Sequence, residues 1–173
     1  MSFSTLTTQR YSVRRFKDQP VEERHLSLIL EAARNAPTAG NRQPQRILVI
    51  SQPEGLQKID RCTRCRFGAP VVLLIGYDPG ASWVRPFDGT SSGWVDASIV
   101  TTQMMLQATE LGLGTTWVMH FDPAKVFEEF SPPANFVPVA MLILGYPAAD
   151  SVPTDRHTLR HPLSKLVAFE HFV

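Results

Sequence analysis

The chain has 173 residues, a length typical of one domain that buries about 70% of the surface its unfolded form exposes. Its 43% hydrophobic and 19% charged content is that of a globular protein and excludes the disordered and fibrous classes. Seventeen Lys and Arg residues against sixteen Asp and Glu leave a formal net charge of +1. The chain therefore has no charge surplus with which to bind a nucleic-acid backbone or an anionic membrane surface.

The sequence carries no signature of secretion, of membrane insertion or of a metal centre. Apolar runs such as Val71 to Tyr77 are far shorter than a bilayer-spanning helix, and the N-terminus has no apolar signal core. The two cysteines, Cys62 and Cys65, are too few for a disulfide framework or a four-ligand zinc site. We expect a soluble, cytoplasmic protein without a metal site.

Apolar periodicity in the first half of the chain predicts alternating helices and strands. Leu26, Ile29, Leu30 and Ala33 recur at helical spacing, and Pro37 ends that segment. Short runs rich in β-branched residues predict buried strands. The predicted elements are a short N-terminal helix before Arg10, helix 21–36, a turn-rich loop over 37–44, strand 47–50, helix 53–61 and strand 70–77.

In the second half, residues 78–93 are rich in Pro, Gly, Ser and Asp around Trp83 and Phe87, which is typical of a lid or binding loop. The elements predicted after it are helix 96–111 with Gly112 as its C-cap, strand 115–119, helix 123–130 with Asp122 as its N-cap, and strand 139–145. The tail over 147–173 is polar and then amphipathic, so we expect it to pack on a partner such as a second copy. The pattern predicts one α+β or α/β layered domain over residues 1–173.

Two segments are candidates for ligand binding. In the first, over residues 10–16, Arg10 and Arg14 flank Ser12; guanidinium forks and a hydroxyl suit a phosphate monoester, although a solvated basic turn is the alternative. The second is the 37–44 loop, whose amides could bind the polar edge of a heterocycle and which could equally be a turn that ends a helix.

Two other motifs point to different chemistry. Gly112-Leu113-Gly114 follows a helix and precedes a strand, the reverse of a dinucleotide fingerprint, so we reject a Rossmann site. Cys62 and Cys65 form a Cys-x-x-Cys motif, and the neighbouring Arg64 and Arg66 could lower a thiol pKa. The alternative is that these thiols are structural.

Taken together and in this order, four segments resemble the nitroreductase family of FMN-dependent oxidoreductases. They are residues 10–16, 36–44, 112–117 and 144–148, and the resemblance runs from about Leu6 to about Val167. It implies an α+β fold, a three-layer α/β/α sandwich with a mostly antiparallel central sheet. It also implies an interlocked homodimer with two FMN sites at the subunit interface.

The resemblance also implies roles for particular residues. Arg10 would bind the FMN phosphate, joined by Arg160, and Tyr11 would also bind the cofactor. Ser12 and Arg14 would lie near the pyrimidine edge, with Arg14 near N1 and O2. The other subunit would supply Pro37, Thr38, Ala39 and Asn41. Within the same chain, the backbone of Val118, Met119 and His120 would face the flavin N5.

In a protein of this family, NADH or NADPH would pass hydride to flavin N5, and a nitroaromatic, quinone or similar small-molecule acceptor would then be reduced in a ping-pong cycle. No side chain need act as acid or base. The chain departs from the family in its short length, in Gln45 where an aromatic residue is frequent and in His120 where glycine is frequent, so its pocket edges differ. Trp83, Phe87 and Trp94 could replace part of that wall. A flavin-binding protein for storage or sensing is one alternative, and a Cys62/Cys65 thiol oxidoreductase is another.

Overall fold

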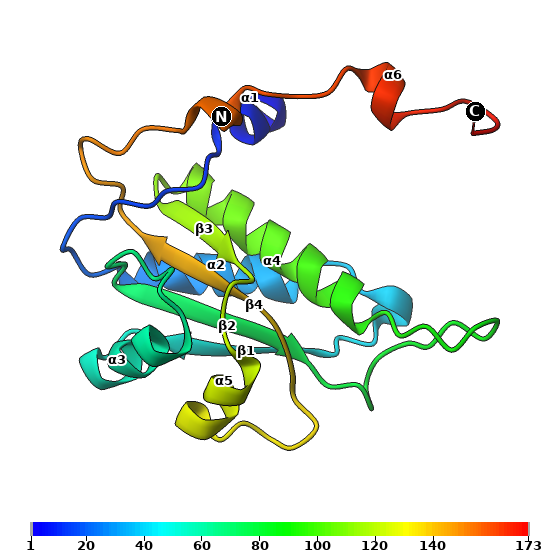
Figure 1. Cartoon of the computed structure of the whole chain (residues 1–173), viewed down its shortest axis with the longest axis horizontal. Coiled ribbons are helices and arrows are strands. Elements are labelled where there is room, and N and C mark those ends of the chain that lie inside the picture. Colours follow the sequence, from blue (N-terminus) through cyan, green and yellow to red (C-terminus); the bar gives the residue numbers. More distant parts are fainter. Residues whose placement is uncertain (1, 173) are drawn as a thin grey trace.

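A four-stranded antiparallel sheet forms the centre of the computed structural model, which describes residues 2–172 (Figure 1). Its strands are β1 (Gln45–Ile50), β2 (Val71–Tyr77), β3 (Gly114–Val118) and β4 (Val137–Gly145), in the order β1-β2-β4-β3. β2 and β4 lie in the middle and are covered on both faces, which explains why both read as continuous apolar runs. The prediction of a mostly antiparallel sheet is confirmed.

Helices cover both faces of this sheet, so the predicted three-layer sandwich is also confirmed (Figure 1). α2 (Glu23–Arg34) and α4 (Gly93–Glu110) pack on one face, where Leu142 and Leu144 of β4 point. α3 (Pro53–Cys62) and α5 (Pro123–Phe130) pack on the other face, against Met141 and Ile143. The alternation of side chains along β4 thus divides the core into two apolar clusters.

The long helix α4 begins at Gly93, three residues before the start that the sequence predicts. The Asp96 backbone N–H donates to the Ser92 carbonyl, which adds a turn before Asp96. A Cβ on Gly93 would overlap the Tyr77 ring, so glycine permits this close approach. At the other end, Gly112 has φ +78° just beyond the helix, as expected for a residue that ends it.

The chain ends differ from the core because they lie on the surface. α1 (Phe3–Gln9) packs against α4, and the tail returns beside it before α6 (Leu163–Leu166) projects away (Figure 1). Leu163 is 75% and Phe169 82% exposed, so the apolar tail is not buried within its own chain. Its packing on a second copy stays a prediction. Across residues 2–172, the structure contains no helix with the length and hydropathy needed to cross a membrane.

Candidate functional site

The N-terminal segment and the tail together form a small cavity of about 220 Å³, which we name the arginine pocket. The Tyr11 hydroxyl donates to the Ser151 carbonyl at 3.0 Å, and the Tyr11 and His157 rings meet edge to face with centroids 6.2 Å apart. These contacts join segments about 140 positions apart in the sequence. The residues that line the pocket are Arg10, Tyr11, Ser12, Arg14, Thr154, Arg156, His157 and Arg160.

The arginine pocket carries positive charge without a compensating carboxylate. None of its lining residues is acidic, and within residues 2–172 its four arginines take part in no salt bridge. Burial, and then the charge of Arg160, lower the pKa of Arg10. Arg15, by contrast, lies outside this cavity and pairs with Asp150 at 2.5 Å. The pocket is therefore a ready site for an anion with several oxygen atoms.

Strand β3 fixes the backbone beside this pocket. Ser12 forms a parallel bridge to Thr115, the Val13 N–H donates to the Thr115 carbonyl at 2.9 Å, and the Thr116 hydroxyl donates to the Val13 carbonyl. A Cβ on Gly114 would lie 2.5 Å from Val13 Cγ2, so the segment can approach only because residue 114 is glycine. Gly114 thus allows Ser12 and its neighbours to pack beside β3, a role that the sequence pattern does not predict for the Gly-x-Gly motif.

The second predicted set, Pro37, Thr38, Ala39 and Asn41, lies around the short 3₁₀ turn Ala39–Asn41. The buried Asp96 carboxylate accepts from the Ala39 N–H at 2.9 Å and from the Ser92 hydroxyl at 2.6 Å, which ties this loop to the first turn of α4. The arginine pocket lies beside the start of β3, which follows the opposite end of α4. Since α4 has 18 residues, its two ends are about 27 Å apart. A single chain therefore does not bring the 37–41 loop to the arginine pocket.

The third predicted set, Val118, Met119 and His120, lies at the end of β3. There Met119 and His120 meet the Cys62–Arg64 segment around an open cavity of about 710 Å³, which we name the β3-end pocket. Val118 is buried, whereas the Met119 side chain is 60% exposed. The residues that line this pocket are Asp60, Arg61, Cys62, Thr63, Arg64, Met119, His120, Phe121 and Asp122.

Cys62 fits the structural alternative rather than a thiol activated by nearby arginines. Its side chain is 4% exposed and its thiol donates to the Lys58 carbonyl at 3.3 Å. Burial, with a smaller contribution from the Glu129 charge, raises the pKa of Cys62 to about 11. The guanidinium of Arg66 is bound to Asp60 instead. Because the thiolate is the nucleophile, Cys62 is poorly suited to thiol exchange at neutral pH.

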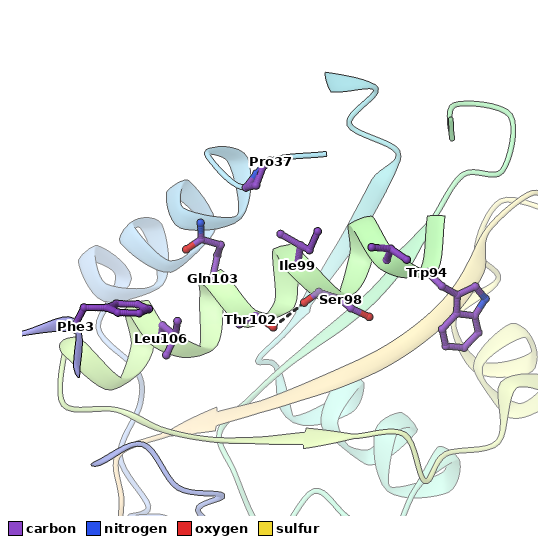
Figure 2. Close-up of a pocket in the computed structure, with 9 residues that line it drawn as sticks. Phe3, Pro37, Trp94, Ser98, Ile99, Thr102, Gln103 and Leu106 are labelled. Atoms are coloured by element: carbon purple, nitrogen blue, oxygen red, sulfur yellow. Dashed lines mark hydrogen bonds between the residues drawn. The ribbon is translucent and has the colours of Figure 1, made fainter. Parts of the chain in front are cut away.

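The outer face of α4 bears a shallow apolar depression of about 650 Å³, which we name the α4 face (Figure 2). Phe3 from α1 and Pro37 from the predicted loop flank it, and Trp94 lies at its far end (Figure 2). Phe3 is 70% and Trp94 45% exposed. Exposed apolar area of this kind marks an interaction surface.

Comparisons with known proteins identify the family. The nitroreductase family model matches residues 7–67 and 64–146. The chain belongs to the nitroreductase family. Among solved structures, this nitroreductase-family chain is 44% identical to a nitroreductase family protein from Clostridium difficile 630, covering 99% of this chain and 100% of that one with a TM-score of 0.94.

Two further relatives carry names or ligands that bear on chemistry. The FMN reductase [NAD(P)H] of Bacillus subtilis is 28% identical over 86% of this chain and 67% of its own. A Desulfovibrio desulfuricans protein solved in complex with FMN is 28% identical, covers 98% of this chain and 97% of that one, and has a TM-score of 0.75.

Sequence reasoning about this nitroreductase-family chain missed several residues of the site. Thr154, Arg156 and His157 join Arg160 in the arginine pocket, yet they lie in a segment that reads as a polar tail. The spacing of Arg156 and Arg160, four residues apart in that tail, is a signal that could have found them. Asp96 was assigned only to a helix start, and nothing local in the sequence points to its hydrogen bond with Ala39.

Proposed function

We propose that this nitroreductase-family protein takes hydride from NADH or NADPH through bound FMN and delivers it to a nitroaromatic, quinone or similar small-molecule acceptor in a ping-pong cycle. The observation that carries the proposal is the arginine pocket, with four guanidiniums and no carboxylate. The B. subtilis FMN reductase and the D. desulfuricans protein solved with FMN support the choice of cofactor. The two free thiols, Cys62 and Cys65, suit a reducing cytoplasm, where we place the protein.

The donor groups of the arginine pocket fit FMN. Arg10 and Arg160 would hold the phosphate, because a dianion relieves the repulsion between two neighbouring cations. Tyr11 would contact the cofactor, and Ser12 and Arg14 would lie near the pyrimidine edge, with Arg14 facing N1 and O2. When bound, FMN supplies hydride transfer at N5, which places negative charge near N1. A cation fixed beside N1 favours that charge.

The backbone at the end of β3 would support the reactive side of the ring. Val118 is the last residue of β3, the strand whose start pairs with Ser12, and Met119 and His120 follow it directly. One strand of five residues thus connects the two ends of the proposed cofactor site. In this account no side chain exchanges a proton with the reacting atoms, and the protein contributes orientation and a fixed electrostatic environment.

We propose that the functional unit is a homodimer. A second copy would cover the α4 face, receive the exposed tail and bring its Pro37, Thr38, Ala39 and Asn41 to the first copy's arginine pocket. The separation of these sets along α4 supports this arrangement. Light scattering on the FMN-loaded protein should give the mass of a dimer. A monomer that binds FMN equally well would contradict the proposal.

Steady-state kinetics test the cycle. With NADH or NADPH varied at several fixed concentrations of a quinone, a ping-pong cycle gives parallel double-reciprocal lines. Bound FMN that neither donor reduces would refute the proposed function and favour the storage protein. Intersecting lines would refute the ping-pong order while leaving the hydride transfer in place.

A further inference from the structure

The β3-end pocket has walls that are held in place before any ligand binds. The Thr63 hydroxyl donates to the His120 carbonyl at 2.5 Å, and the Asp122 N–H donates to the Cys62 carbonyl at 2.9 Å. The Thr63 hydroxyl oxygen also accepts from the Cys65 N–H at 3.1 Å, which holds the backbone on either side of Arg64. Two segments distant in sequence are therefore joined, with Arg64 on one wall and Met119 on the other.

Two of the four Asp and Arg side chains that line this pocket are paired with residues beside it. The Nε and Nη2 groups of Arg61 donate to the Glu129 carboxylate, and the Arg66 guanidinium donates to the Asp60 carboxylate at 2.7 Å. The Asp122 carboxylate caps α5 by accepting from the Ala124 N–H at 2.9 Å.

Arg64 and Asp122 are the charged lining residues that take part in no salt bridge within the described part of the chain. The Asp122 carboxylate is held by the α5 backbone N–H groups of Ala124 and Lys125, whereas Arg64 is exposed. The exposed His120 completes the titratable lining. The pocket thus presents one free guanidinium.

An apolar surface lies in the same cavity. The Met119 side chain is 60% exposed, and the partly buried Phe121 lies two residues further along. A polarisable thioether makes favourable contacts with aromatic rings. The cavity therefore combines a surface for a flat apolar ring with a single cation, a pair of features that suits an aromatic carboxylate.

We propose that the β3-end pocket binds the electron acceptor and that Arg64 makes the enzyme prefer aromatic acceptors that carry a carboxylate. This inference rests on the proposed function, which places Met119 and His120 at the reactive side of the flavin. It goes further by naming a charged substrate class and the residue that selects it.

A pair of nearly isosteric acceptors, 4-nitrobenzoate and neutral 4-nitrobenzamide, tests the inference. Calorimetric titration of each into the FMN-loaded, oxidised protein measures binding without turnover, and kcat/KM measures selectivity. We expect the wild type to prefer the benzoate by about fivefold, the upper end for a solvent-exposed ion pair. Arg64→Gln should abolish the preference and Arg64→Lys should keep part of it. The matched control Arg34→Gln, which removes a paired arginine from α2 on the opposite face of the sheet, should keep all of it.

Four results would overturn the inference. The first is a wild type without preference, and the second is a preference that survives Arg64→Gln. The third is a loss of FMN affinity in Arg64→Gln, which would assign Arg64 to the flavin itself. The fourth is a change in the NADPH to NADH ratio of Arg64→Gln with the benzoate preference intact, which would assign Arg64 to the donor's 2′-phosphate. If the benzoate binds selectively but NADH and NADPH never reduce the flavin, the proposed function fails while the anion pocket stands.

Discussion

Arg10→Ala should weaken FMN binding strongly without destabilising the empty protein. Arg10 is partly buried in a cavity that holds three other arginines and no acid. A hydrogen bond to a charged group contributes about 1.5–3 kcal/mol, which corresponds to FMN binding weakened about 10- to 150-fold. Burial is the main cause that lowers the pKa of Arg10, and the charge of Arg160 is the second cause. In the flavin-free protein, Arg10→Ala removes this repulsion between the two arginines. The free energy of unfolding should therefore stay within about 0.5 kcal/mol of the wild-type value, as for a surface substitution.

Fluorescence titration of FMN and urea unfolding of the flavin-free protein measure these two quantities. Arg15→Ala is the matched control, because its guanidinium pairs with Asp150 outside the pocket. That variant should bind FMN like the wild type. The reasoning is refuted if Arg10→Ala keeps wild-type FMN affinity, or if it destabilises the flavin-free protein enough to explain the loss.

Other substitutions test the supports of the site. Gly114→Ala would place a Cβ 2.5 Å from Val13 Cγ2, so urea unfolding should show a loss of about 1–3 kcal/mol; wild-type stability would contradict the close approach. Asp96→Ala removes the acceptor of the Ala39 N–H, so we expect a loss of about 1–3 kcal/mol and faster proteolysis at residues 37–41. Because burial raises the pKa of Cys62 to about 11 from a usual value of 9.0, the folded protein keeps a proton that the unfolded chain releases, and stability falls between these pH values; Cys62→Ala should show a shallower fall in pH-dependent unfolding. The double variant Cys62→Ser, Cys65→Ser should retain NAD(P)H-dependent turnover, and loss of turnover in a folded protein would favour the thiol oxidoreductase.

The sequence predicts most elements of this fold because the local pattern of each segment agrees with the helix or strand that it forms. Apolar runs give β2 and β4, helical periodicity gives α2, and Asp122 with Pro123 marks the start of α5. The start of α4 is the exception. Glycine normally weakens a helix. At position 93 it is needed because the ring of Tyr77, which is distant in sequence, leaves no room for a Cβ. Such tertiary contacts leave no local signal in the sequence.

The candidate site is less predictable because its parts come from distant segments. The pattern around Arg10, Ser12 and Arg14 indicates an anion site, and the structure brings Arg160 to it as the family resemblance implies. Arg156 and His157 reach the same pocket only through the return of the tail along the N-terminal segment. The pKa of Cys62 depends on burial, which the neighbouring arginines in the sequence do not reveal.

The visible absorption spectrum of the purified protein, before and after anaerobic addition of NADH and then NADPH, tests the central claim most directly. We predict a flavin spectrum that bleaches with at least one donor and recovers when a nitroaromatic or quinone is added. A colourless protein that takes up no added FMN would contradict the assignment of the arginine pocket. Bound flavin that neither donor bleaches would contradict the proposed oxidoreductase activity.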